Sequence, residues 1–171
     1  MNIFLSGYMG VGKSTVGKIL ATRLQYSFVD LDLFIENQEG MSIPGIFSSK
    51  GEAIFRELEQ SAVLKLLKED NKIIALGGGS LENPNINKRI RTSGLLIYLE
   101  AGVDLLYERL RHEKKDRPLI AEIEEDQLHS FITSHLALRE SNYQKAQLKI
   151  NVENKSPEEI AGFLIEYMDL I

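Results

Sequence analysis

Apolar residues recur along the chain in five short runs, and longer segments with helical periodicity separate these runs. The runs cover residues 3–5, 26–29, 72–76, 95–99 and 148–152. The first and fourth runs are unbroken, as expected of strands that are buried on both faces. In the fifth run, Leu148, Ile150 and Val152 alternate with polar residues, which is typical of a half-exposed strand. We therefore predict five strands.

The segments between these strands predict helices. Apolar positions at helical spacing mark the first helix, and Ser156-Pro157-Glu158-Glu159 has the capping pattern that begins the last one. The helices are expected over residues 14–24, 31–37, 51–69, 83–93, 103–110 and 125–143, and from about residue 157 onward. No linker or repeat interrupts the alternation of strands and helices. It predicts one α/β domain over residues 1–171, with a five-stranded parallel sheet and helices on both faces.

The segment Gly7-Tyr8-Met9-Gly10-Val11-Gly12-Lys13-Ser14 joins the first strand to the first helix and has the pattern G-x-x-x-x-G-K-S. Its glycines let the backbone curl so that N–H groups point at phosphate oxygens, and the helix N-terminus adds its positive dipole end. Lys13 supplies a charge for the outer phosphates, and the Ser14 hydroxyl is suited to ligate Mg²⁺. A glycine-rich turn without a ligand is the alternative. The complete strand-loop-helix context favours binding of a nucleoside triphosphate.

Two further polar or glycine-rich groups follow strands directly. Asp30 and Asp32 close the second strand, and Gly77, Gly78 and Gly79 follow the third. The carboxyl ends of parallel strands share one edge of the sheet, where ligands bind. Triphosphate chemistry needs ligands for Mg²⁺ and a group that orients the acceptor hydroxyl, which favours these roles for the aspartates over helix capping. Three successive glycines permit close backbone approach to a substrate or phosphate, although a flexible turn is the alternative.

Composition narrows the classes of protein that are compatible with this loop. The chain is 43% hydrophobic and 26% charged, as in ordinary soluble proteins. Its 20 basic and 25 acidic residues give a net charge of −5, which argues against a nucleic-acid-binding surface. The absence of cysteine excludes disulfides and thiolate metal sites. No apolar run approaches the about 20 residues of a membrane span, and the first strand begins too early for a signal peptide, so we expect a cytoplasmic protein.

The phosphate loop alone does not distinguish a GTPase, an ATPase and a kinase. A guanine-reading motif N-K-x-D is approached only at Asn154-Lys155-Ser156-Pro157, which has proline where the aspartate should be. A signalling GTPase is therefore disfavoured.

Two arginines lie in helical segments where their roles differ. Glu52 precedes Arg56 by one turn, and this spacing by itself favours a solvated ion pair. Arg139 instead continues an apolar stripe that begins at Leu128, so its charge needs an anionic partner such as a ligand carboxylate; a side chain that extends past the helix end to solvent is the alternative. His135 lies on the same stripe and is expected to be packed and hydrogen-bonded rather than metal-binding.

Over essentially its whole length the chain resembles the shikimate kinase family, P-loop kinases with the nucleoside monophosphate kinase-like fold and a mobile lid. The phosphate loop is shared by many kinases, whereas the other matching elements are more specific. These elements are Asp30-Leu31-Asp32, Phe55-Arg56-Glu57-Leu58-Glu59, Gly77-Gly78-Gly79, Arg117-Pro118-Leu119 and Arg139-Glu140-Ser141-Asn142-Tyr143. The resemblance implies transfer of the γ-phosphoryl group of ATP to the 3-hydroxyl of shikimate in aromatic amino-acid biosynthesis.

The resemblance also implies roles for individual residues. Lys13, Asp32 and Arg117 would be catalytic, and Ser14 and Asp30 would hold Mg²⁺, Asp30 through water. The substrate shikimate would contact Asp32, Arg56, Gly77, Gly78, Gly79 and Arg139, and ATP would contact Gly10, Val11, Gly12, Lys13, Ser14, Thr15, Arg109 and Arg117. The charged residues from Arg111 to Arg117 could by themselves be a solvated surface run, but the resemblance implies that a segment at about 111–122 forms the lid. It also implies that Arg109 stacks near adenine.

Two other functions stay open at this point. One is a different small-metabolite kinase of related fold, such as a gluconate kinase, and the other is an ATP-binding module without turnover. The intact Lys13, Ser14 and Arg117 argue against the second. A monomer that binds neither nucleic acid nor a membrane is expected in each case.

Overall fold

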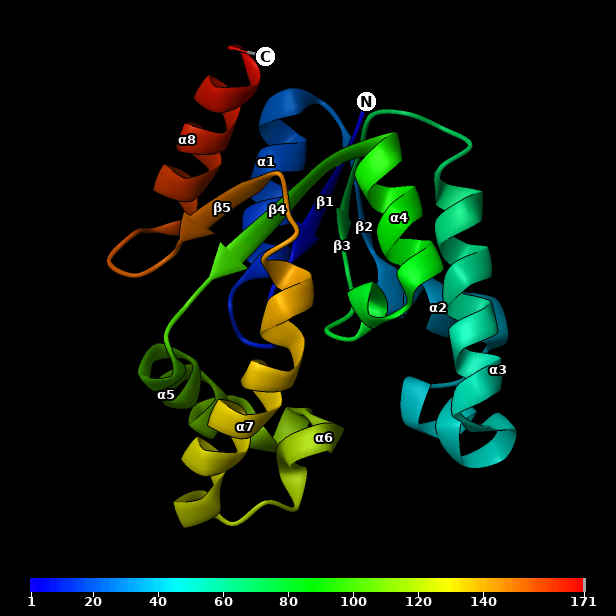
Figure 1. Ribbon diagram of the computed structural model, residues 1–171, viewed down its shortest axis with the longest axis vertical. Coiled ribbons are helices and arrows are strands. Elements are labelled where there is room, and N and C mark those ends of the chain that lie inside the picture. The colour runs from blue at the N-terminus through cyan, green and yellow to red at the C-terminus, as the bar shows by residue number, and fades with distance from the viewer. Residues whose placement is uncertain (171) are drawn as a thin grey trace.

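The computed structural model describes residues 1–170, except for the side chain of Asp116. Its centre is one sheet of five parallel strands in the order β2-β3-β1-β4-β5. The strands are β1 (Asn2–Ser6), β2 (Ser27–Asp30), β3 (Lys72–Ala75), β4 (Gly94–Glu100) and β5 (Leu148–Asn151). The predicted α/β fold with a five-stranded parallel sheet is therefore confirmed (Figure 1).

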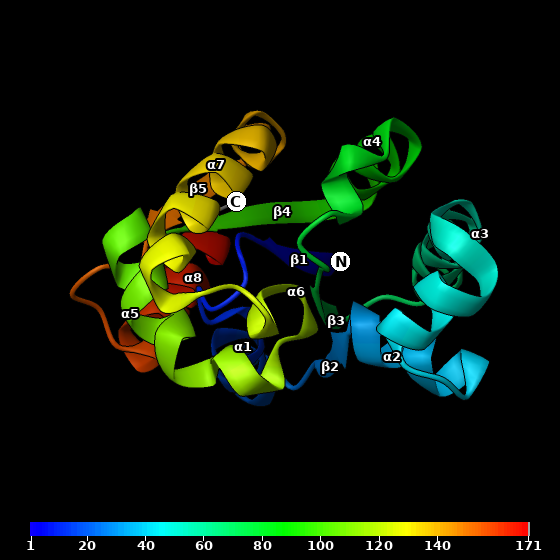
Figure 2. The ribbon, with the colours of Figure 1, turned by 90° about the horizontal axis from the view of Figure 1, so that it is seen from below.

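Helices connect the strands and cover both faces of the sheet. They are α1 (Lys13–Leu24), α2 (Leu31–Glu39), α3 (Ile43–Leu66), α4 (Pro84–Ser93), α5 (Val103–Glu113), α6 (Pro118–Ala121), α7 (Glu125–Tyr143) and α8 (Pro157–Met168), with short 3₁₀ turns η1 (Ser80–Glu82) and η2 (Lys114–Asp116). Figure 2 shows α4 and α7 on one side of the sheet and α1 and α8 on the other. Within the described residues, no helix is long and apolar enough to cross a membrane.

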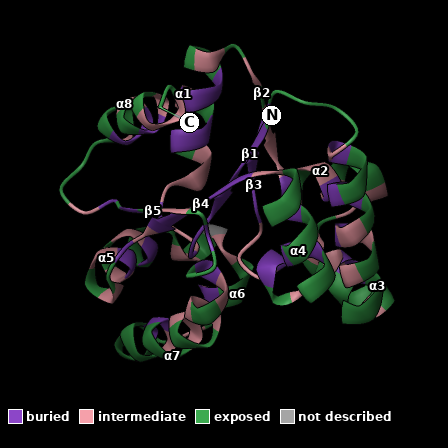
Figure 3. Ribbon diagram, turned by 45° about the horizontal axis from the view of Figure 1, so that its top comes forward, coloured by how far each residue is buried: buried purple, intermediate pink, exposed green. Residues whose placement is uncertain are grey.

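The central strand β1 is buried on both faces, and its side chains alternate between two hydrophobic clusters. Ile3 and Leu5 belong to the cluster that includes residues of α1 and α8, whereas Phe4 belongs to the cluster that includes residues of α3 and α4. In Figure 3 the buried residues follow the central strands, and the outward sides of the helices are exposed. The unbroken apolar run therefore reflects a strand with a helical layer on each side.

The helix boundaries differ most from the predicted ones in two places. α3 begins at Ile43, earlier than predicted, and Gly51 (φ 83°, ψ 168°) is non-helical and divides it by a kink, so the helix predicted from about residue 51 is its second segment. Glycine tolerates this left-handed conformation because it has no Cβ atom. α5 extends to Glu113, and the charged segment that follows it contains η2 and α6 rather than irregular chain.

The order of the strands places β3 between β1 and β2, so the second strand is not the direct neighbour of the phosphate loop. The loop after β1 and the aspartates after β2 nevertheless lie at the same edge of the sheet, because all strands are parallel. Figure 1 shows α5, α6 and α7 gathered beyond the carboxyl end of β4.

Candidate active site

The phosphate loop leaves β1 and curls through glycines with positive φ. Gly7, Gly10 and Gly12 have φ values of 138°, 77° and 105°. A Cβ atom at Gly7 would lie 2.5 Å from the carbonyl oxygen of Leu99, so the absence of a side chain lets the loop pack closely against the backbone of β4. The loop therefore requires glycine both for its backbone conformation and for its packing.

Lys13 is the first residue of α1, and its side chain folds back over the loop. Its Nζ atom donates hydrogen bonds to the carbonyl oxygens of Gly7 at 2.8 Å and Tyr8 at 3.1 Å. Burial lowers the pKa of Lys13 to about 8, although the negative charge of Asp32 opposes this effect. A phosphate would bring the negative charge that favours the protonated amine.

Ser14 and Asp30 form a hydroxyl-carboxylate pair beside Lys13. The Ser14 hydroxyl donates to Asp30 Oδ2 at 3.0 Å, while Asp30 Oδ1 accepts from the backbone N–H of Leu33 at 3.3 Å as the cap of α2. Asp30 therefore caps α2 with one carboxylate oxygen and contacts the phosphate loop residue Ser14 with the other. One hydroxyl and one carboxylate fit Mg²⁺, which usually takes only one or two protein ligands beside phosphate oxygens and waters.

Asp32 lies in the first turn of α2 and faces the loop. Burial, followed by the charges of Asp30 and Glu59, raises the pKa of Asp32 to about 6. No hydrogen bond to its carboxylate is formed within the part of the chain that the structure describes. A partly buried carboxylate with an open face is suited to accept a hydrogen bond from a ligand hydroxyl.

Two cavities meet at this edge of the sheet. The smaller, about 250 Å³, contains the phosphate-loop residues Gly10, Gly12, Lys13, Ser14 and Thr15, together with Asp30. The larger, about 630 Å³, lies beside α2, α3 and α7 and includes Arg56, Gly79 and Arg139. Five residues belong to the lining of both cavities: Met9, Asp32, Gly77, Gly78 and Arg117.

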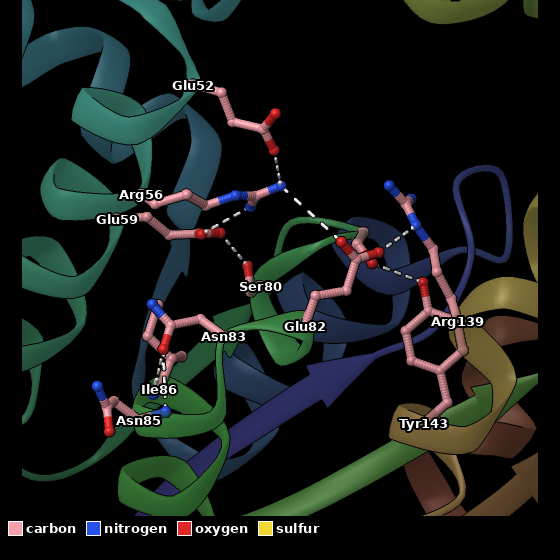
Figure 4. Close-up of polar contacts among 11 residues, drawn as sticks. Glu52, Arg56, Glu59, Ser80, Glu82, Asn83, Asn85, Ile86, Arg139 and Tyr143 are labelled. Carbon is pink, nitrogen blue, oxygen red and sulfur yellow. Dashed lines mark hydrogen bonds and ion pairs between the residues drawn. The ribbon is translucent and has the colours of Figure 1, made fainter.

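Two guanidinium groups converge over the triple glycine that follows β3. A Cβ atom at Gly79 would lie 3.1 Å from Arg56 Nη2 and 3.5 Å from Arg139 Nη2, and one at Gly78 would lie 2.7 Å from Arg139 Nη1. The Tyr143 hydroxyl donates to the Gly78 carbonyl oxygen at 2.8 Å and holds the loop (Figure 4). The glycines therefore leave space for both arginines, and the larger cavity has two cationic groups on one wall.

Arg56 makes the predicted pair with Glu52 and also an inward pair that the sequence analysis did not identify. Its Nη2 atom lies 3.3 Å from Glu52 Oε1, and its Nη1 atom donates to Glu59 Oε2 at 3.0 Å. Glu59 is buried and accepts a second hydrogen bond from the Ser80 hydroxyl at 2.6 Å. Glu59 therefore ties α3 to the turn after the glycines and holds the Arg56 guanidinium.

The segment proposed as a lid carries Arg117 to the junction of the two cavities. Arg117 Nε donates to Glu113 Oε2 at 2.9 Å, and both residues line the smaller cavity. Arg109 lies at the back of the phosphate loop, where Nη1 donates to the carbonyl oxygens of Gly10 at 3.2 Å and Val11 at 2.9 Å. Its expected contact with adenine stays a prediction.

His135 is packed and hydrogen-bonded, as predicted. Its Nδ1 atom lies 2.7 Å from the Tyr8 hydroxyl oxygen, and its ring packs against Phe131 with centroids 5.0 Å apart. Burial lowers the pKa of His135, which favours the neutral ring.

Several residues in or beside the site were not identified from the sequence, among them Met9, Glu59 and Glu82. Met9 could have been found because it lies inside the phosphate loop, at one of the x positions of the motif. Glu59 could have been found because it lies one helical turn after Arg56. Glu82 had no such indication, because its partners Arg56 and Arg139 come from other segments of the chain.

The chain is similar to known proteins in sequence and in fold. The family model for shikimate kinase matches residues 9–169. The shikimate kinase of Flavobacterium johnsoniae is 40% identical over 168 residues, which cover 97% of this chain and 98% of that protein. The crystal structure of shikimate kinase from Bacteroides thetaiotaomicron has a TM-score of 0.91 and 33% identity, and covers 100% of this chain and 99% of its own. A shikimate kinase from Acinetobacter baumannii in complex with shikimate has a TM-score of 0.89 and 30% identity, with coverages of 99% and 93%.

Proposed function

The chain belongs to the shikimate kinase family, whose members use ATP and Mg²⁺ to phosphorylate shikimate, and we propose that its two connected cavities divide the two substrates between them. The smaller cavity, with the phosphate loop, would hold the triphosphate of ATP. The larger cavity, with its two arginines, would hold shikimate. The observation that carries this proposal is that Asp32 and Arg117 line both cavities.

Asp32 and Arg117 would act at the junction, where the 3-hydroxyl of shikimate meets the γ-phosphoryl group. Asp32 would accept a hydrogen bond from the attacking hydroxyl and orient it. Arg117 would interact with the transferring phosphoryl group from one side and Lys13 from the other. Phosphoryl transfer needs little covalent assistance from a protein, so positioning and charge stabilisation would account for most of the catalysis.

Ser14 and Asp30 would hold Mg²⁺, Ser14 directly and Asp30 through water. When bound, the ion neutralises negative charge on the phosphates. In this arrangement Asp30 also keeps its position as the cap of α2, which fixes the carboxylate relative to the loop. Thr15 and the backbone of Gly10, Val11 and Gly12 would contact the phosphates.

Arg56 and Arg139 would bind the carboxylate of shikimate, and the backbone of Gly77, Gly78 and Gly79 would contact its ring. Both guanidinium groups face the larger cavity, and Arg139 is only 15% exposed. A planar guanidinium can donate two parallel hydrogen bonds to a carboxylate, which the lysine amine cannot reproduce.

The segment at about 111–122 would close as a lid over the junction and bring Arg117 onto the phosphoryl group. Closure would also exclude water, which limits hydrolysis of ATP. Its charged residues, and the position of Arg117 in the lining of the smaller cavity, support this role. Arg109 would contact the nucleotide beside the loop. The proposal also includes a single domain over residues 1–171. The enzyme would be monomeric and cytoplasmic, and it would bind neither nucleic acid nor a membrane.

The experiment is an ADP-release assay with shikimate, and with gluconate as the comparison acceptor. In the presence of ATP, we expect turnover with shikimate and none with gluconate. Arg139→Ala should raise the KM for shikimate while leaving the KM for ATP nearly unchanged, and Arg89→Ala, an exposed arginine of α4, is the matched control. Equal losses with both substrates would contradict the assignment of the larger cavity.

A further inference from the structure

A carboxylate of the chain itself lies between the two arginines of the larger cavity. Glu82 Oε1 accepts a hydrogen bond from Arg139 Nε at 2.8 Å, and Glu82 Oε2 lies 4.0 Å from Arg56 Nη2. Figure 4 shows the Glu82 side chain reaching from the turn after the glycines into the space between the two guanidinium groups. One oxygen faces each arginine, as expected of a bound ligand carboxylate.

We propose that Glu82 is a specificity-determining residue that competes with the substrate carboxylate for Arg56 and Arg139. This inference rests on the proposed function, in which these arginines bind shikimate. An anionic ligand replaces the Glu82 carboxylate with its own, whereas a neutral ligand leaves the internal pair in place. Glu82 therefore lowers the affinity for the true substrate and makes a negative charge a condition for engaging both arginines.

The two arginines depend on Glu82 to different degrees. Arg56 keeps its contacts with Glu59 and Glu52 when Glu82 moves away. Arg139 has Glu82 as its only acidic partner within the described residues, and it is largely buried. Arg139 would lose its counter-charge unless another carboxylate arrives, and a largely buried charge without a partner is unfavourable. The exchange is thus coupled to the charge of the incoming ligand.

Glu82 can leave this position by moving its side chain alone. The side chain is 41% exposed, so its carboxylate has access to water. The backbone around it is held by other contacts: the Glu82 N–H donates to the Gly79 carbonyl oxygen at 3.0 Å, and Ser80 is fixed to Glu59. The cap of α4 is Asn83 rather than Glu82. A neutral side chain at position 82 is therefore compatible with the same fold.

The test is the Glu82→Gln variant, which keeps the shape of the side chain and removes its charge. Exposed and half-exposed ion pairs have modest energies, so we expect shikimate to bind roughly two- to fivefold more tightly, with a matching fall in its KM. The KM for ATP should not change. The carboxamide analogue of shikimate should bind both proteins equally, because it does not replace the internal carboxylate. Glu82→Ala should change shikimate binding in the same direction.

The matched control is Glu57→Gln, which removes one negative charge from an exposed position of α3 beside Arg56 in sequence. It should leave shikimate affinity unchanged and thereby separate local competition from a general charge effect. Unchanged or weaker shikimate binding in Glu82→Gln would overturn the inference and make Glu82 a support for the arginines. If Arg139→Ala failed to weaken shikimate binding in both the wild-type and Glu82→Gln backgrounds, the assignment of the arginines itself would be wrong.

Discussion

Replacing Asp32 by asparagine separates its catalytic contribution from its effect on stability. Asparagine preserves the shape of the side chain but removes the charge and the proton acceptor. We expect turnover to fall by roughly 10²–10⁴-fold, the usual range for a positioned acid-base group, with the KM for ATP nearly unchanged. The same substitution should make the substrate-free protein more stable, because the site holds the ionised carboxylate at a cost.

The size of this stability gain follows from the pKa of Asp32. Burial and nearby acids raise the pKa from 3.8 to about 6, and this value already includes the attraction of Lys13. Because the folded-state pKa is above the unfolded one, the cost is absent below about pH 4, grows as the pH rises through 6 and is complete above it. It corresponds to about 3 kcal/mol at pH 8 and about half of that at pH 5, as upper values.

Thermal unfolding of the substrate-free proteins measures this difference. For a chain of this length, about 3 kcal/mol corresponds to a Tm increase of up to roughly 6–12 °C at pH 8. The increase should shrink as the pH is lowered toward 5. Asp70→Asn is the matched control, because the Asp70 side chain is 74% exposed, and its stability should change by less than about 0.5 kcal/mol.

Three results would refute the reasoning. A variant with reduced stability at pH 8 would show that the Asp32 carboxylate supports the fold through contacts of its own. A stability gain that does not depend on pH would show that its charge is not the cause. Full activity in Asp32→Asn would remove the aspartate from the catalytic site altogether.

Three further predictions test the nucleotide side of the site. Lys13→Ala should abolish turnover and leave the fold intact, because the lysine charge acts on the phosphates. The control is Lys18→Ala, which changes an exposed lysine of the same helix. An active Lys13→Ala enzyme would contradict the phosphate-loop assignment. Asp30→Asn should raise the Mg²⁺ concentration needed for activity. If added Mg²⁺ restored the activity of Asp32→Asn but not that of Asp30→Asn, the roles of the two aspartates would be reversed. Arg117→Ala should strongly lower turnover, and residues 111–120 should gain protection from protease when both substrates bind. Protection that ignores the substrates would indicate a static surface loop.

Local patterns in the sequence determined most of the secondary structure and one half of the site. Strand β1, the phosphate loop and α1 are contiguous, so apolar runs, glycines and helical periodicity along one short segment were sufficient. The parallel sheet followed from the alternation of strands and helices. Gly51 shows a limit of the same approach: the helix predicted from about this residue is present after the kink, whereas the helical segment that precedes it, from Ile43, was not predicted.

The other half of the site depends on contacts between segments that are distant in the sequence. Arg56 comes from α3, Arg139 from α7 and Glu82 from the turn after β3. The two arginines meet over Gly79, with Glu82 as a shared partner, only in the folded chain. Local spacing correctly indicated the pair of Arg56 with Glu52 but contained no information about Glu82. Helical and strand periodicities describe neighbours along the chain, whereas the order of strands in the sheet decides which distant side chains meet. The sequence alone therefore predicted the loop at which we propose that phosphate binds, and only the tertiary structure decided which charges surround the second cavity.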